Sequence, residues 1–286
     1  MTPPTHSDAL KSVQALGLAR LDAQLLMLHV LARPSHDRAW LLTHDNDLLP
    51  SELAQAFNQL AQRRAAGEPL AYLVGHKEFF GLHLAVDARV LVPRPDTETL
   101  VNWALEQLQV EGSAAHPHIL DLGTGSGAVA LALAHTRQTG GQPGRIVAVD
   151  ASTEALVAAQ TNATRLALDV SFLKSDWFDQ VAGCFDLIVS NPPYIADADP
   201  HLAQLTHEPL QALTSGADGL DDLRRIIEQA PAHLQAGGWL LLEHGYDQSE
   251  SVRALLVQHG FADVQSRLDL SGIERCSGGR WDGTAG

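Results

Sequence analysis

The spacing of hydrophobic positions changes twice along the chain. Residues 8 to about 70 are rich in Ala, Leu and Gln, and their apolar positions recur at helical spacing: Leu18, Leu21, Leu25, Leu28 and Leu31. Turn-forming residues interrupt this pattern at 33–35, 46–50 and 67–69, and Ser51 is placed to cap the next helix. We predict a small helical domain over residues 1–72.

Strand-like patterning follows. Residues 78–86 are expected to be extended with a turn at Gly81, which predicts a β-hairpin linker over residues 73–92. From residue 118 onward, strand and helix signals alternate, which is typical of a doubly wound, mostly parallel α/β sheet over residues 93–286. The expected strands are 119–122, 146–150, 170–173, 185–190, 239–243 and 262–269, and the expected helices include 128–134, 153–166, 221–234 and 249–259. The glycine-rich end, residues 277–286, is expected to be loose.

Composition restricts the kind of function. The chain of 286 residues has 34 acidic and 19 basic residues and a formal net charge of −15, so stable binding to a nucleic-acid backbone is not expected. The two cysteines, Cys184 and Cys276, are far apart and show no metal-ligand spacing, which suits a reducing cytoplasm and predicts no metal. The polar, proline-bearing start does not resemble a secretory signal, and the longest apolar stretch, residues 25–32, is too short to cross a membrane. We expect a cytoplasmic protein without a membrane partner.

A glycine loop follows the first strand of the α/β region. Gly123, Gly125 and Gly127, with Thr124 and Ser126 between them, allow a tight turn and bring helix N–H groups close to a ligand. Asp150 ends the next strand, where an acidic residue binds a ribose hydroxyl. This pattern fits NAD and S-adenosylmethionine equally well.

Three further residues are candidates for the same ligand. Asp121 stands just before the loop and suits the ammonium of an amino-acid group, while Asp176 and Trp177 end the third strand and suit the flank of an adenine. A strand-end turn for Asp121 and a core aromatic for Trp177 are equally good interpretations of the sequence alone.

The tetrapeptide Asn191-Pro192-Pro193-Tyr194 favours methyl transfer. It follows the apolar strand 185–190, so it is expected at the edge of the sheet where ligands bind. The prolines stiffen the backbone and remove N–H donors, which leaves the Asn191 side-chain oxygen and the Pro192 carbonyl to accept from a planar NH2 group beside the Tyr194 ring. Hydride transfer does not require such a clamp, whereas methylation of a planar nitrogen does.

Upstream, Pro93-Arg94-Pro95-Asp96-Thr97-Glu98 predicts a rigid turn in which Asp96 or Thr97 caps a helix reaching about residue 109. From the sequence alone, this segment is either a capped helix start or a turn that closes over the site.

With these residues placed, the chain resembles the HemK/PrmC family of protein-(glutamine-N5) methyltransferases, which act on peptide chain release factors. The resemblance is nearly end to end. The matching segments are 69–75, 78–81, 90–98, 121–127, 175–178, 191–194, Glu208-Pro209 with Ala212-Leu213, 218–221, and 269–272 with Arg275. Ser271 stands where Ala is expected, and the loop at 140–144 is longer than usual.

The resemblance implies a class I methyltransferase sheet of seven strands, joined to the helical domain by the hairpin. It implies that the residues of the loop 123–127, Asp150 and Trp177 bind S-adenosylmethionine, and we expect Asp121, Asp176 and Asn191 to bind it as well. It also implies that Asn191, Pro192, Pro193 and Tyr194, which carry the catalysis, bind the glutamine of a release factor's Gly-Gly-Gln motif. Pro93, Arg94, Pro95 and Glu98 are expected at the substrate side, and the N-terminal helices are expected to help dock the release factor.

Two alternatives stay open at this point. Adenine also presents a planar NH2 group, so an adenine-N6 methyltransferase acting on DNA or RNA would use the same tetrapeptide. A non-catalytic scaffold that only binds the cofactor is the other alternative.

Overall fold

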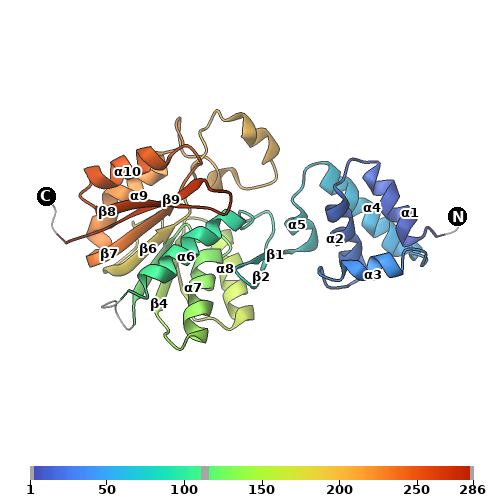
Figure 1. The fold of residues 1–286 in the computed structure, drawn as a ribbon, viewed down its shortest axis with the longest axis horizontal. Coiled ribbons are helices and arrows are strands. Elements are labelled where there is room, and N and C mark those ends of the chain that lie inside the picture. Colours follow the sequence, from blue (N-terminus) through green and yellow to red (C-terminus); the bar gives the residue numbers. More distant parts are fainter. Residues whose placement is uncertain (1–2, 111–115, 284–286) are drawn as a thin grey trace. The chain divides into compact units, whose positions relative to one another are not determined.

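The computed structural model describes residues 3–110 and 116–283, and the chain divides into two compact units after His76 (Figure 1). The first unit is helical. Its helices are α1 (His6–Gln14), α2 (Arg20–Val30), α3 (Arg38–Thr43), α4 (Ser51–Ala65) and α5 (Leu70–Val74).

The core of the helical unit is formed mainly by α1, α2 and α4. Along α2, the fully buried residues are Ala23, Leu26, Met27 and Leu28. Leu21, which the apolar spacing placed in the core stripe, is 47% exposed, because small residues such as Ala23 occupy part of the buried face. The predicted Ser51 cap is also wrong, since Pro50 precedes the first turn and no side chain caps this helix.

A two-stranded hairpin opens the second unit. It consists of β1 (His76–Phe79) and β2 (Leu82–Ala85), with Phe80 and Gly81 at positive φ in the turn. The hairpin is attached to the helix that spans residues 153–166: Asn162 accepts from the Ala85 N–H at 2.7 Å and donates to the Ala85 carbonyl at 3.0 Å.

The remaining elements alternate as the sequence predicts. They are the short 3₁₀ helix η1 (Pro95–Thr97), α6 (Glu98–Gln107), β3 (His118–Leu122), α7 (Ala128–Thr139), β4 (Arg145–Asp150), α8 (Thr153–Leu166), β5 (Ser171–Lys174), β6 (Phe185–Ser190), η2 (Pro200–Gln204), η3 (Leu210–Ala212), α9 (Asp221–Gln229), η4 (Ala230–His233), β7 (Leu234–Glu243), α10 (Ser249–Gln258), β8 (Ala262–Leu268) and β9 (Glu274–Arg280).

The seven strands form one sheet in the order β5-β4-β3-β6-β7-β9-β8. β9 runs antiparallel to β7 and β8, and the pairs among the other five strands are parallel. From β3 the chain proceeds outward to β4 and β5, then returns to place β6 on the other side of β3. The order therefore reverses between β3 and β6, and in open α/β sheets the ligand site lies at such a reversal.

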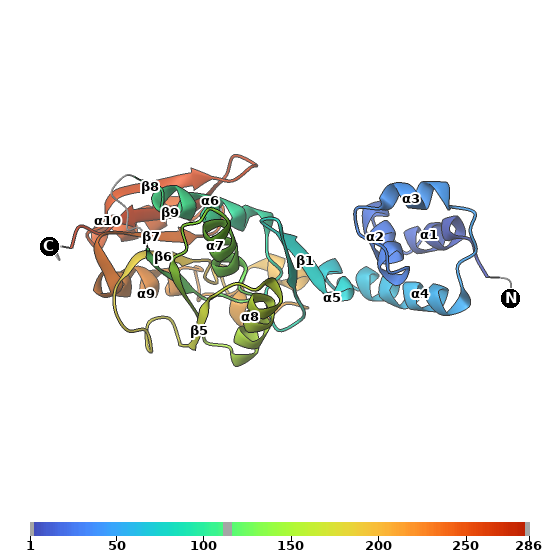
Figure 2. The same ribbon diagram turned by 90° about the horizontal axis from the view of Figure 1, so that it is seen from below.

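Helices cover both faces of this sheet (Figures 1 and 2). Leu120, Ile188 and Leu240 share one face and form a core with α9 and α10. Alternate residues such as Ile119 and Leu187 point to the other face, where α6, α7 and α8 contact the strands. Since both faces are covered, the inner parallel strands β3, β4 and β6 are largely apolar, as expected for a buried parallel sheet.

Two expectations about the carboxyl-terminal part are wrong. The segment 277–280 is not loose: it belongs to β9, which lies between β7 and β8 and pairs with both. Glycine is required there, because a Cβ on Gly278 would lie 2.5 Å from the Leu240 carbonyl oxygen. The helix expected over 221–234 ends at Gln229, since Pro231 lacks the N–H needed to continue it.

Candidate functional site

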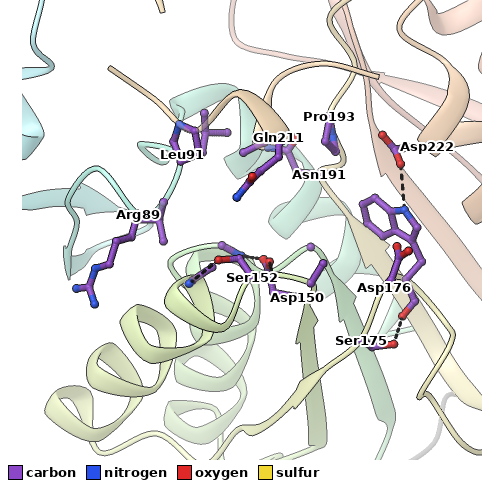
Figure 3. Close-up of a pocket in the computed structure, with 18 residues that line it drawn as sticks. Arg89, Leu91, Asp150, Ser152, Ser175, Asp176, Asn191, Pro193, Gln211 and Asp222 are labelled. Atoms are coloured by element: carbon purple, nitrogen blue, oxygen red, sulfur yellow. Dashed lines mark hydrogen bonds between the residues drawn. The ribbon is translucent and has the colours of Figure 1, made fainter. Parts of the chain in front are cut away.

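The carboxyl ends of four neighbouring strands meet at one cavity of about 410 Å³ (Figure 3). Leu122 of β3 pairs with Val149 of β4 and with Ser190 of β6, so the segments that follow these strands start side by side. These segments and the one after β5 contribute Gly123, Gly125, Asp150, Asp176, Trp177, Asn191 and Pro193 to the lining. Figure 3 shows Asp150 and Ser152 across the opening from Leu91, Gln211 and Asn191.

The glycine loop leads directly into α7. Gly123 has φ +71°, and a Cβ there would lie 3.2 Å from the Trp177 ring. Gly127, with φ +85°, precedes the first helical residue, and a Cβ on it would lie 2.9 Å from the Leu131 side chain. Larger residues at these positions would push the loop away from the indole or from the helix, so glycine keeps the loop close to both.

Asp150 braces this loop in addition to lining the cavity. One carboxylate oxygen, Oδ2, accepts from the Gly125 N–H at 2.9 Å, and Oδ1 accepts from the Ser152 N–H at 2.8 Å. Burial raises the pKa of Asp150, and the two backbone hydrogen bonds oppose that effect. The sequence placed Asp150 at the site but gave no sign of its bond to the loop.

Asp121 borders a second, smaller cavity of about 50 Å³ together with Thr97, Thr124 and Asn191. Its side chain is buried, and its Oδ2 accepts from the Thr124 hydroxyl at 2.6 Å and from the Ala130 N–H at 3.2 Å. Burial raises the pKa of Asp121 to about 6, against the lowering effect of these two bonds. The Asp121 carboxyl therefore changes charge close to neutral pH.

Trp177 is held in position by its indole N–H. This group donates to Asp222 Oδ1 at 3.0 Å, and the residue has φ +47°. Its neighbour Asp176 forms an ion pair with Arg225 at 2.8 Å. Asp222, at the start of α9, was not among the residues expected from the sequence.

The Asn191–Tyr194 segment is fixed by contacts to three different elements. Asn191 Nδ2 donates to Thr97 Oγ1 at 3.2 Å, and the Tyr194 hydroxyl donates to Glu243 Oε1 at 3.4 Å. The Tyr194 carbonyl accepts from Gln248 Nε2 at 3.0 Å. Burial raises the pKa of Tyr194, so its hydroxyl keeps its proton.

The Pro93–Glu98 segment borders the smaller cavity and not the larger one. Pro93 and Arg94 line the smaller one, and Arg94 forms an ion pair with Glu208, whose other oxygen accepts from the Val92 N–H at 3.1 Å. Glu98 instead accepts from the Phe80 N–H at 3.0 Å and so joins α6 to the hairpin. Five of the expected site residues line neither of these two cavities: Pro95, Glu98, Gly127, Pro192 and Tyr194.

Besides Asp222, two acidic residues of this region were missed as site residues. Glu208 belongs to the segment Glu208-Pro209, which was noted in the sequence. Its ion pair with Arg94 could not be predicted, because the two residues lie more than a hundred positions apart. Glu243 directly follows the apolar residues at the end of strand β7. An acidic residue in that position could have marked it as a candidate site residue.

Over residues 3–110 and 116–283, no cluster of three or more His, Cys, Asp or Glu side chains could hold a metal ion. No helix within the same ranges is long and apolar enough to cross a membrane.

Comparison with known proteins identifies the family. Residues 7–75 match the PrmC N-terminal domain, and residues 101–258 match the methyltransferase small domain. A release factor glutamine methyltransferase of Bordetella pertussis is 51% identical over 267 residues, which cover 92% of this chain and 95% of that protein. The chain belongs to the release factor glutamine methyltransferase family. Another member, from Burkholderia pseudomallei, is 45% identical and covers 99% of both chains.

The fold agrees with this family. A 16S rRNA methyltransferase of T. thermophilus, solved in complex with AdoMet and guanosine, superimposes with a TM-score of 0.51 at 21% identity over 72% of this chain and 49% of that chain. This likeness shows the class I methyltransferase fold, and the protein is an S-adenosylmethionine-dependent enzyme.

The cavity suits that cofactor. Its volume lies in the range of small-molecule sites, a glycine loop forms one wall, the half-buried Asp150 lines it, and the buried Asp121 borders the adjoining smaller cavity. Hydroxyl and ammonium groups are natural partners for carboxylates.

Proposed function

We propose that this protein methylates the side-chain amide nitrogen (N5) of the glutamine in the Gly-Gly-Gln motif of peptide chain release factors. The observation that carries the proposal is the place of Asn191, which lines both the larger and the smaller cavity. A nitrogen bound by Asn191 would lie where the two cavities meet. Relatives named release factor glutamine methyltransferase, at 42–51% identity over more than nine-tenths of the chain, support the choice of substrate.

S-adenosylmethionine, when bound, supplies a methyl group on a positively charged sulfur. In our proposal the loop 123–127 and Asp150 bind its adenosine, and Trp177 with Asp176 flanks the adenine. Both bonds described for the Asp121 carboxylate reach Oδ2, so Oδ1 is the oxygen we assign to the ammonium group, with Thr124 and Ser126 beside it.

A carboxamide nitrogen is a weak nucleophile because its lone pair is delocalised into the carbonyl, so orientation has to provide much of the rate. We assign the two N–H hydrogens of the glutamine to the Asn191 side-chain oxygen and the Pro192 carbonyl. These acceptors also stabilise the positive charge that the nitrogen gains. Pro193 keeps the turn rigid, and Tyr194 offers its ring face. The methylated nitrogen is acidic and loses its proton to water or a nearby oxygen, so no side-chain base is required.

Further assignments follow from the same proposal. Pro93 and Arg94 border the smaller cavity, and we assign them, with Pro95 and Glu98 behind them, to the substrate side of the site. We propose domain limits of 1–72, 73–92 and 93–286, with the N-terminal helices assisting release factor docking. Since release factors work with ribosomes, the proposed place of action is the cytoplasm.

Methyl transfer tests the proposal directly. The protein is incubated with methyl-labelled S-adenosylmethionine and, in parallel, with a release factor, double-stranded DNA or RNA. We expect label only in the release factor. Asn191→Ala should lower turnover by roughly 10²–10³, the effect of losing one preorganised polar group, while cofactor affinity stays within about twofold. Label in nucleic acid alone would support an adenine methyltransferase, and an Asn191→Ala variant with normal turnover would contradict the assigned clamp.

A further inference from the structure

Glu243 is a buried carboxyl beside the substrate clamp, and the proposed mechanism leaves it without a role. It ends β7 and is 1% exposed. The strand register pairs Ser190 with Leu242, so Asn191 and Glu243 are the next residues on neighbouring strands. Its Oε2 is buried and has no partner of normal hydrogen-bond geometry among the described residues. An incompletely paired buried carboxyl is unfavourable for stability, which points to a functional reason for its presence.

Thr97 connects this carboxyl to Asn191. Its side chain is buried, and its Oγ1 accepts from Asn191 Nδ2 at 3.2 Å. Burial raises the pKa of Glu243 to about 7, and the nearby Thr97 hydroxyl has the largest effect that opposes this shift. Thr97 therefore bonds to Asn191 and lies near Glu243, whose unpartnered Oε2 can accept the Thr97 hydroxyl hydrogen.

The hydrogen-bond donors and acceptors of Glu243, Thr97 and Asn191 determine how the Asn191 amide is oriented. A carboxylate can only accept hydrogen bonds, and a threonine hydroxyl has one hydrogen to donate. When Thr97 donates that hydrogen to Glu243, its oxygen can only accept from Asn191. The Asn191 NH2 group is thereby drawn to Thr97, and the Asn191 oxygen is left for the cavities.

Protonation of Glu243 reverses the directions of these hydrogen bonds. It can donate to Thr97, and the Thr97 hydrogen then becomes available for the Asn191 oxygen. The amide is favoured in the flipped orientation, with its NH2 group directed at the substrate. Two NH2 groups facing each other cannot form a hydrogen bond, so this orientation does not hold the glutamine.

We infer that Glu243 and Thr97 are positioning residues, which hold the Asn191 amide with its oxygen directed at the substrate nitrogen. The inference rests on the proposed function, because that function identifies the nitrogen. The charged and titratable groups that face Glu243 are Asp96 from η1, Tyr194 after β6, and Arg275 and Cys276 from β9. Asp96 favours the neutral carboxyl and Arg275 favours the carboxylate.

Turnover of Thr97 variants tests the inference at saturating cofactor. Thr97→Val removes the hydroxyl at nearly constant volume and should lower kcat by roughly tenfold to 100-fold, whereas Thr97→Ser should retain most of it. In an Asn191→Ala background, Thr97→Val should cause no further loss, because the group being oriented is already absent. Thr161→Val is the matched control, since that exposed hydroxyl donates to the Val157 carbonyl of its own helix. Equal losses from Thr97→Val in both backgrounds would overturn the inference.

Glu243→Gln tests the role of the carboxylate. In the wild type, kcat should rise as the pH increases through about 7, where the carboxyl ionises. Glu243→Gln should show low turnover without this rise. An unchanged pH profile in the variant would also overturn the inference.

A nuclear magnetic resonance measurement keeps the inference separate from the proposed function. The side-chain NH2 signals of Asn191, assigned with Asn191→Ala, are followed in nitrogen-15-labelled protein without any substrate. We expect slowed hydrogen exchange of this NH2 group at pH 8, and loss of that protection in Thr97→Val and in Glu243→Gln. Absence of protection in the wild type would reject the orientation, whereas failure to methylate a release factor with protection intact would reject the proposed function alone.

Discussion

Lowering the pH from 7 to 5 should weaken cofactor binding, because it neutralises Asp121. Burial raises the pKa of this carboxyl to about 6, and the residue borders the cavity assigned to the ammonium group of the cofactor. If only the ionised form binds well, the apparent Kd increases by the factor 1 + 10^(pKa − pH), which is about 1.1 at pH 7 and about 11 at pH 5. The predicted loss of affinity is therefore about tenfold.

Isothermal titration calorimetry measures this loss together with its proton linkage. At pH 6 about half of the Asp121 carboxyls are protonated, so binding should release roughly 0.5 proton per site, seen as a dependence of the binding enthalpy on the buffer. Asp121→Asn should bind about 10- to 100-fold more weakly at pH 7, as expected for a lost hydrogen bond to a charged group. Its affinity should also vary little between pH 5 and 7.

The contribution of Asp150 to the pH dependence of cofactor affinity has to be measured separately. Burial raises the pKa of Asp150 as well, and this residue lines the larger cavity. Asp150→Asn should keep the pH dependence that Asp121 causes. A wild-type affinity that is constant from pH 5 to 7, or a pH dependence that persists in Asp121→Asn, would refute the assignment of Asp121 to the ammonium group.

Three further predictions concern other residues. Asp150→Ala removes the acceptor for the Gly125 and Ser152 N–H groups and should weaken cofactor binding about 10- to 100-fold in calorimetry. The control Asp179→Ala changes an exposed ion pair and should bind the cofactor normally. Equal cofactor affinities of the two variants would contradict the role of Asp150. Gly278→Ala should lower the free energy of unfolding by about 1–3 kcal/mol through overpacking against Leu240. The control Gly140→Ala, at the end of α7, should change this free energy little. Equal denaturation midpoints of the two variants would contradict the close packing of Gly278 against Leu240. Burial raises the pKa of Glu243 from 4.5 to about 7, so the folded state holds this proton more tightly, and the resulting stabilisation is lost as the pH rises through 7. Between pH 5 and 8 the wild type should therefore lose about 2–3 kcal/mol relative to Glu243→Gln in urea unfolding, and parallel pH profiles would show that Glu243 ionises normally.

Much of the fold was predictable because its signals are local. The strand 185–190 and the helix 153–166 have the predicted limits, since each is a short apolar or periodic run between turn residues. The glycine loop and Asn191-Pro192-Pro193-Tyr194 follow their strands directly, so both could be placed at the carboxyl edge of a parallel sheet before the strand order was known.

The missed features depend on contacts between distant segments. Residues 277–280 have the composition of a loose end, and the narrow space between β7 and β8 explains why glycines form an interior strand there. Glu243 lies beside Asn191 because β7 is the neighbour of β6, which the strand order decides. The bond from Gly125 to Asp150 likewise requires β3 and β4 to be adjacent.

The most direct test of the central claim is mass spectrometry of a release factor after incubation with this protein and S-adenosylmethionine. We predict a single added methyl group, which fragmentation places on the side-chain amide of the glutamine in Gly-Gly-Gln, and its near absence with Asn191→Ala. A release factor that stays unmodified while calorimetry shows bound cofactor, or a methyl group on any other residue, would contradict the account.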